Sequence, residues 1–187
     1  MKRYVVYLLI VGALITSCKD VQKEAYLAEI EQMNNQLDSL WTEIEQNNTD
    51  SLKGVSMTIR TVIDKVQKNY FPDSVDLDIA GSMNMYKDVM KSLERNSGNL
   101  AKAKAAIPEI KETLSNLKHD IENGAGNREE YPENVAYERA KVNQVDELLV
   151  FYFTARDESL TNFLDVHPKI EAFANELEEK RQQEMND

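Results

Sequence analysis

The stretch that decides the fold runs from Asp76 to Asn123 and reads DLDIAGSMNMYKDVMKSLERNSGNLAKAKAAIPEIKETLSNLKHDIEN. Bulky apolar residues recur in it at intervals of seven: Ile79, Tyr86, Leu93, Leu100, Ile107, Leu114 and Ile121. The other half of the repeat is filled by Met83, Met90, Ile110 and Leu117. A sustained seven-residue repeat is typical of a helix that packs lengthwise on other helices. We therefore expect one long helix over 76–123.

Two features of this stretch oppose a continuous helix. Pro108 removes a hydrogen bond to the carbonyl of Lys104, so we expect a kink near Pro108. The segment 96–99 (NSGN) is a poor helix former, because Gly98 costs about 1 kcal/mol relative to alanine. The apolar repeat keeps its phase across both features, and a reversing turn would have no reason to preserve it. We favour a kinked continuous helix, with a break at 96–99 as the alternative.

Apolar residues at steps of three and four predict helices on both sides of this stretch as well. The expected ranges are 20–46, 50–70, 132–166 and 168–184. Turn or breaker residues separate them, including Pro72, Gly124, Gly126 and Pro168. No segment shows the alternation of a strand. The sequence predicts an all-α fold, an elongated, coiled-coil-like antiparallel bundle that forms a single domain over 18–187.

Composition excludes several classes of protein. The chain has 187 residues, with 22 basic and 33 acidic ones, and a formal net charge of −11. Such a chain is poorly suited to the phosphates of nucleic acids, so we expect no nucleic-acid partner. Six glycines and four prolines are too few for an all-β fold. The single cysteine excludes an intramolecular disulfide framework and a cysteine-based zinc cluster.

The N-terminal residues have the pattern of a secretory signal. Lys2 and Arg3 precede an uncharged, largely apolar run from Tyr4 to Ile15. This run is too short to cross the ~30 Å hydrocarbon core of a bilayer as a helix. We expect residues 1–17 to be a cleaved signal peptide.

The sequence Leu14-Ile15-Thr16-Ser17-Cys18 resembles a bacterial lipobox. The resemblance implies cleavage before Cys18 and acylation of its thiol. Two or more acyl chains hold a protein stably on a bilayer, so lipidated Cys18 would provide a membrane anchor. The following Lys19-Asp20 resembles the start of a signal that sends some Bacteroidota lipoproteins to the cell surface, although Val21 stands where a second acidic residue would be expected. We expect attachment in the cell envelope, at the outer membrane, with the periplasmic or surface face left open.

Three features together resemble small uncharacterised helical lipoproteins of Bacteroidota. These are Cys18 after its lipobox, the segment 47–53 (NNTDSLK) and the segment 114–124 (LSNLKHDIENG). The resemblance implies an exported, lipid-anchored helical protein. It carries no catalytic residues to this chain.

The two histidines do not predict a metal or catalytic site. His119 has Glu122 one turn further along, which would make a weak metal-binding face at most, so we interpret it as a solvated helix residue. His167 precedes Pro168, and we expect it at a helix end, near the negative end of the dipole. With Cys18 acylated there is no free thiol, and no Gly-x-Ser-x-Gly turn exists to present a serine. We expect no enzyme activity, no metal and no cofactor.

Acidic clusters have simpler explanations than chemistry. The segment 76–81 imitates the opening of a calcium loop, but Ala80 and Lys87 occupy positions that need oxygen ligands. Its aspartates are better interpreted as residues at a helix N-terminus. Glu129 and Glu130 are interpreted as solvated charges rather than the facing carboxylates of a glycosidase.

Aromatic residues cluster in the C-terminal half. We expect Phe151, Tyr152 and Phe153 to form a buried layer inside the bundle, since most aromatic area is buried. Tyr131 and Tyr137, flanked by Glu and Asn, are the better candidates for an exposed contact.

These observations favour a non-enzymatic envelope protein, a scaffold or a binding module, with an envelope protein as its partner. The alternative is a carrier that holds a lipid or a glycan in a groove between helices, lined by adaptable side chains. The residues expected to line that groove are Met83, Met85, Tyr86 and Met90. Unused heptad positions leave a homo-oligomer open as well.

Overall fold

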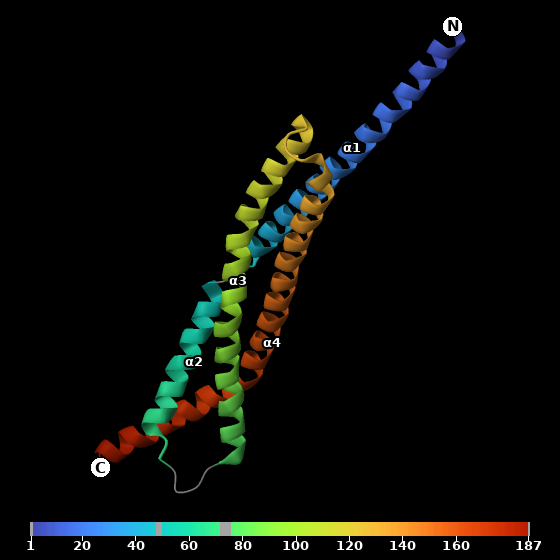
Figure 1. Ribbon diagram of the computed structural model, residues 1–187. Helices are drawn as coiled ribbons and strands as arrows, with labels where there is room; N and C mark the ends of the chain where they lie inside the picture. The colour runs from blue at the N-terminus through green and yellow to red at the C-terminus, as the bar shows by residue number, and fades with distance from the viewer. Residues whose placement is uncertain (1, 48–49, 72–75, 187) are drawn as a thin grey trace. The chain divides into compact units, whose positions relative to one another are not determined.

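The computed structural model describes the backbone of residues 2–47, 50–71 and 76–186, and the side chains of 22–47, 52–71 and 76–186. The elements are α1 (Lys2–Gln46), α2 (Asp50–Asn69), α3 (Leu77–Asn123), the 3₁₀ helix η1 (Arg128–Glu130) and α4 (Tyr131–Asn186) (Figure 1). No strand occurs in these ranges. The all-α prediction of packed helices is confirmed.

The chain forms two compact units. Unit 1 contains Met1–Ile44 and Ala103–Glu147, and unit 2 contains Glu45–Lys102 and Leu148–Asp187. Unit 1 therefore consists of α1 up to Ile44, the second part of α3 and the first part of α4. Unit 2 consists mainly of α2, the first part of α3 and the larger part of α4. The prediction of a single domain over 18–187 stays a prediction.

The long helix over 76–123 is present as α3. The helix continues through 96–99, so the alternative break there is wrong. It also continues through Pro108. Ile107 and Ile110 on either side of Pro108 are both buried, so packing offsets the hydrogen bond that the proline removes.

The predicted interruption at His167–Pro168 is wrong, because α4 continues through Pro168 to Asn186. The predicted helices 132–166 and 168–184 are thus one element. Val166 and Ile170 flank the proline and are both buried in the core of unit 2. A proline inside a helix removes one backbone hydrogen bond, and the burial of these neighbours holds the helix together across that gap.

The N-terminal predictions fall outside the described side chains. Helix α1 begins at Lys2, whereas the side chains described in it begin at residue 22. The predicted signal peptide 1–17 and the thiol of Cys18 therefore stay predictions. In the part of the chain that was described, no helix is both long enough and apolar enough to cross a membrane.

The core of unit 1 is almost entirely aliphatic. The apolar seam of α1 faces those of α3 and α4, and buries Ile30, Met33, Leu37, Ile107, Leu114, Ile121, Val135 and Val142. Polar contacts flank this core. Arg139 on α4 pairs with Glu29 on α1 (3.3 Å), and Lys111 on α3 pairs with Asp38 on α1. These contacts place the three helices side by side within unit 1.

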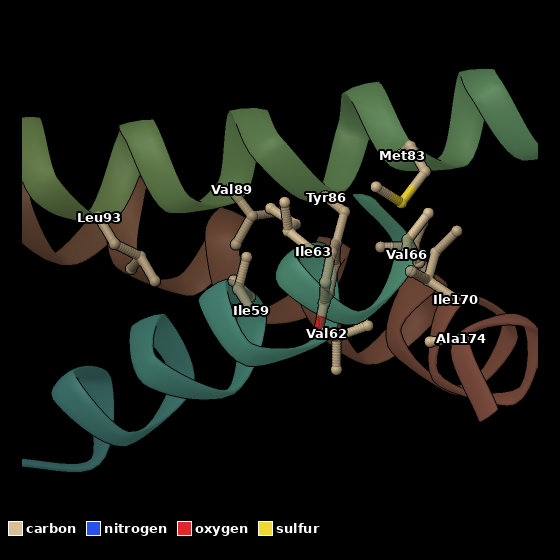
Figure 2. Close-up of a cluster of buried hydrophobic side chains, with 11 residues drawn as sticks. Ile59, Val62, Ile63, Val66, Met83, Tyr86, Val89, Leu93, Ile170 and Ala174 are labelled. Atoms are coloured by element: carbon tan, nitrogen blue, oxygen red, sulfur yellow. The ribbon is translucent and has the colours of Figure 1, made fainter. Parts of the chain in front are cut away.

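The core of unit 2 contains more aromatic and polar groups. It buries Ile59, Val62, Ile63, Val66, Met83, Tyr86, Val89, Leu93, Val166, Ile170 and Ala174. Figure 2 shows Tyr86 reaching from α3 towards Val62 of α2. Tyr70 of α2 meets Phe173 of α4 edge to face, with ring centroids 5.3 Å apart.

Helix ends follow the expected capping chemistry where they are described. The Asp76 carboxylate accepts hydrogen bonds from the backbone N–H groups of Asp78 (2.9 Å) and Ile79 (3.2 Å), so Asp76 caps α3 rather than opening a calcium loop. Gly124 ends α3 with φ at +63°, and Ala125 N–H donates to the carbonyl of Asp120 (2.8 Å), which is a Schellman arrangement.

Candidate functional site

A cavity lies at one end of unit 1, and we call it the loop-end cleft. It forms where residues 22–26 of α1 meet the end of α3 and the beginning of α4. Its volume is about 790 Å³. It is lined by Gln22, Lys23, Tyr26, Ile121, Glu122, Asn123, Gly124, Asn127, Arg128, Glu129, Tyr131 and Pro132.

Two cationic side chains of the loop-end cleft, those of Lys23 and Arg128, donate hydrogen bonds to backbone carbonyl groups at the end of α3 or directly after it. The Lys23 ammonium donates to the carbonyl of Glu122 (2.7 Å), and Arg128 Nε donates to the carbonyl of Gly124 (3.4 Å). The end of a helix carries partial negative charge, so both cations lie where the dipole favours them. Each uses one donor in this way, while a lysine has three and an arginine five.

Gly124 makes room for Arg128. Its φ of +63° is a left-handed conformation that glycine adopts without cost. A β-carbon at this position would also lie 2.2 Å from Arg128 Nη2. A side chain here would therefore displace the guanidinium from its place beside the loop-end cleft.

Tyr131 forms the inner wall of the loop-end cleft. It is buried, and its hydroxyl donates to the carbonyl of Asp120 (3.0 Å), with the carbonyl of Ala125 also within reach. The prediction that Tyr131 is exposed is therefore wrong, because its hydroxyl pairs with backbone carbonyls at the end of α3 and in the following loop. Tyr137, in contrast, is 63% exposed, as predicted.

The buried carboxylate of Glu138 links α3 and α4 within unit 1. Glu138 is among the few buried charged residues of the described chain. Thr113 donates to Glu138 Oε2 (2.9 Å), and the Lys141 ammonium lies 2.9 Å from Oε1. The hydrogen bond to Glu138 raises the pKa of Lys141, which keeps the lysine charged and makes it a poor nucleophile.

Unit 2 has a smaller groove between α3 and α4, which we call the α3–α4 groove. Its volume is about 430 Å³, and its lining residues are Met85, Asp88, Val89, Ser92, Glu158, Ser159 and Asn162. Ser159 donates to Ser92 across the two helices (2.9 Å). Asn96 lies one turn further along α3, donates to Ser92 (3.3 Å), and its buried side-chain oxygen has no hydrogen-bond partner.

His167 lies inside a packed layer rather than at a helix end, so that prediction is wrong. Its Nδ1 is 2.8 Å from the Tyr86 hydroxyl, and its ring stacks on Phe163 with centroids 4.5 Å apart. Its Nε2 is 3.5 Å from the Glu171 carboxylate. This Glu–His–Tyr chain resembles a catalytic relay, but burial and the nearby Glu171 raise the pKa of Tyr86, so its phenol stays protonated. The arrangement joins α4 to α3 within the core of unit 2.

Two of the residues expected to line a carrier groove are in the core of unit 2. Met83 and Tyr86 are buried there, whereas Met85 is 44% exposed and lines the α3–α4 groove. Met90 packs against the core from its edge. Met83, Tyr86 and Met90 follow the steps of three and four that mark the buried face of α3, whereas Met85 lies off that face and remains accessible.

Of the remaining sequence predictions, some agree with the structure and one is wrong. His119 is exposed as predicted, and no grouping of three potential metal ligands occurs in the described ranges. Glu129 and Glu130 are exposed, as expected of solvated charges. Of the predicted aromatic layer, Tyr152 is buried and meets Phe153 edge to face, with ring centroids 5.2 Å apart. Phe151, however, is 59% exposed, so its predicted burial is wrong.

Sequence reasoning missed the loop-end cleft altogether. Its cations come from Lys23 and Arg128, which are more than a hundred positions apart. The only local signals are the turn residues Gly124 and Asn127, and these mark a loop rather than a cavity. Val150 and Leu164 are apolar residues that lie exposed on α4.

Comparison with known proteins adds no family to this picture. No protein-family model matches the chain, and no match was found among curated proteins or solved structures.

Proposed function

We propose that this chain is a lipid-anchored helical protein of the cell envelope, attached at the outer membrane through Cys18, that acts as a non-enzymatic scaffold or binding module. The observation that carries the anchor is the lipobox-like sequence ending at Cys18 after a signal-like stretch. The all-helical body supports a structural or binding role, since its best-formed polar clusters join helices to one another. Glu138 holds α3 to α4 in unit 1, and His167 holds α4 to Tyr86 in unit 2.

The anchor is tested by metabolic labelling with a palmitate analogue in the native bacterium. Wild-type protein is expected to carry the label in the outer-membrane fraction, and Cys18→Ala is expected to lose it. Ser17→Ala is the matched control, because it keeps a small residue at the cleavage site and should remain labelled. An unlabelled wild-type protein would disprove the anchor.

The binding role is supported by apolar side chains on the outer face of α4 in unit 2. Val150 is 61% exposed and Leu164 is 70% exposed. They are fourteen residues apart, which is two heptads, so they share one face of the helix. Exposed apolar residues grouped on one face are typical of a contact surface for a protein partner. This feature supports a protein partner for the exposed face of α4.

A photo-crosslinking residue placed at Leu164 tests this role in intact cells. The expected result is a discrete crosslinked band that Val150→Lys abolishes. Met57, which is 69% exposed on α2, is the matched control position and should give no such band. Equal crosslinking from positions 57 and 164 would argue against a specific surface on α4. A band at twice the mass of the chain would identify the partner as a second copy.

A further inference from the structure

We infer that the loop-end cleft binds the phosphoethanolamine headgroup of a membrane phospholipid. The inference rests on the proposed lipid anchor at Cys18, and it assigns a ligand to a cavity that the anchor alone does not explain. Three independent features of unit 1 carry it: the position of the cleft along the chain, its charges, and its apolar wall.

The first feature is the distance to the anchor. Lys23, which lines the loop-end cleft, is five positions after Cys18. Even a fully extended chain of that length spans at most ~18 Å. The headgroup region of one leaflet is about 5–8 Å thick, as the difference between total and hydrocarbon thickness gives. An acylated Cys18 would therefore keep the loop-end cleft at the surface of the bilayer, where headgroups are the most concentrated ligands.

The second feature is the pairing of opposite charges. Lys23 and Arg128 offer cationic donors that their carbonyl partners do not use up. Glu122 and Glu129 line the same cavity with carboxylates. The Glu122 carboxylate has only a long contact with Lys118, at 3.9 Å. Two cations beside two carboxylates complement a zwitterion, with the phosphate on the cations and the ammonium on the carboxylates.

This charge pattern selects among headgroups. A purely anionic headgroup or free phosphate would meet the repulsion of Glu122 and Glu129, in a chain whose net charge is −11. A choline headgroup has no N–H to donate to those carboxylates. Phosphoethanolamine satisfies both halves of the site, because its primary ammonium donates hydrogen bonds and its phosphate accepts them.

The third feature is the apolar wall. Ile121, Tyr131 and Pro132 line the loop-end cleft beside the charged residues. Ile121 and Tyr131 are buried in the core of unit 1 and fix the position of this wall. Pro132 is exposed and Tyr26 is half-buried, so these two offer the accessible apolar surface. An amphipathic ligand with a glycerol backbone would cover Tyr26 and Pro132, whereas a small free ion would leave both exposed to water.

The test is a calorimetric titration of the full chain, acylated or not, in phosphate-free buffer with a non-ionic detergent. The probes are dihexanoyl phosphatidylethanolamine, the corresponding phosphatidylglycerol and phosphatidylcholine, and inorganic phosphate. We expect the ethanolamine lipid to bind at least tenfold more tightly than the other three. Equal affinity for phosphatidylglycerol or for inorganic phosphate would overturn the assignment of a zwitterionic headgroup.

Variants locate the site. The double variant Lys23→Gln/Arg128→Gln should weaken binding of the ethanolamine lipid at least tenfold. Arg60→Gln/Lys91→Gln is the matched control, since it removes two exposed cations of unit 2 that do not line the loop-end cleft. Circular dichroism checks that both variants keep their helix content. If the Lys23→Gln/Arg128→Gln variant is misfolded, the double variant Glu122→Gln/Glu129→Gln is tested instead. We expect it to bind phosphatidylethanolamine no more tightly than phosphatidylglycerol. Unchanged binding in a folded cleft variant would overturn the inference.

The two proposals fail separately. Palmitate labelling reports on the anchor whether or not a headgroup binds. The titration reports on the loop-end cleft with soluble lipids and does not depend on the label. If the protein is labelled but binds no headgroup, the anchor stands and the ligand assigned to the loop-end cleft is wrong. If the protein is unlabelled, the anchor is wrong.

Discussion

In unit 1 the seven-residue repeat of α3 is filled by Ile107, Leu114 and Ile121, whereas in unit 2 the same repeat begins with Ile79 and Tyr86. The consequences differ. Unit 1 packs aliphatic side chains and buries one charged group, Glu138, which has partners on both of its oxygens. Unit 2 packs an aromatic layer around Tyr86 and buries a side-chain oxygen of Asn96 that has no partner.

This contrast teaches that a heptad repeat specifies a helix and its buried face, but not the chemistry of the layer that forms there. A large aromatic residue on the seam needs complementary side chains from the other helices. Phe163 and His167 on α4 supply them at Tyr86. Aliphatic layers interdigitate without such partners, so unit 1 depends less on individual contacts.

The largest expected effect is that of Tyr86→Ala in unit 2. Tyr86 is fully buried, and truncating a buried aromatic residue costs about 3–5 kcal/mol of unfolding free energy. Urea unfolding followed by circular dichroism measures it. Tyr137→Ala removes the same side chain from an exposed position and should change stability by less than about 0.5 kcal/mol. Similar losses at the two positions would contradict the packed aromatic layer.

The next effect concerns the buried carboxylate of unit 1. Glu138→Ala leaves Thr113 and Lys141 without their shared acceptor and should cost about 1–3 kcal/mol. Trp41 is the only tryptophan and belongs to unit 1, so its fluorescence during urea unfolding is the measurement. Glu138→Gln keeps an oxygen for Thr113 and should lose less. Equal losses for the two variants would mean that the charge itself, rather than the Thr113 hydrogen bond, holds the helices.

The next effect is the dependence of the unfolding free energy on alkaline pH, to which Tyr86 of unit 2 contributes. Burial raises the pKa of Tyr86 from its usual 10.0, so the folded state keeps the phenol proton where the unfolded state loses it. Stability is unaffected by this group below pH about 10 and falls above it, by at most ~1.4 kcal/mol per pH unit. Tyr86→Phe should remove this part of the slope in urea titrations between pH 9 and 11.

Other groups titrate in the same direction and remain in that variant. The raised pKa of Lys141 means that its contribution in unit 1 is present below its unfolded pKa and lost as pH rises through its folded pKa. Burial also raises the pKa of Tyr152 in unit 2. Tyr86→Phe should therefore reduce the alkaline slope without abolishing it. An unchanged slope would mean that Tyr86 ionises as readily in the folded state as in the unfolded one.

The smallest expected effect is a gain. Asn96→Ala removes a buried oxygen without a partner and improves helix propensity, at the cost of one hydrogen bond to Ser92. We expect stabilisation of at most about 1 kcal/mol by thermal unfolding. Asn84→Ala, at an exposed position of α3, gives the propensity gain alone and serves as the control. A clear loss at position 96 would show that Asn96 makes an interaction worth more than its single hydrogen bond.

The helices were largely predictable because their signals are local. Steps of three and four placed α2 and α3 within a residue or two of their observed bounds. Pro168 was misleading because sequence alone weighs a lost hydrogen bond, whereas the buried neighbours Val166 and Ile170 decide whether the helix survives that loss. His167 was misplaced for the same reason, since its partner Tyr86 is 81 residues away.

By itself, the sequence determined that this chain is helical, which face of each helix is apolar, and that its N-terminus has the pattern of an anchor. Those properties depend on residues within a few turns of one another. Tertiary structure alone decided that Tyr131 is buried, that Phe151 is exposed, and that Lys23 and Arg128 share one cavity. Such contacts join residues far apart in the chain, and no local periodicity encodes which side chains meet when helices pack.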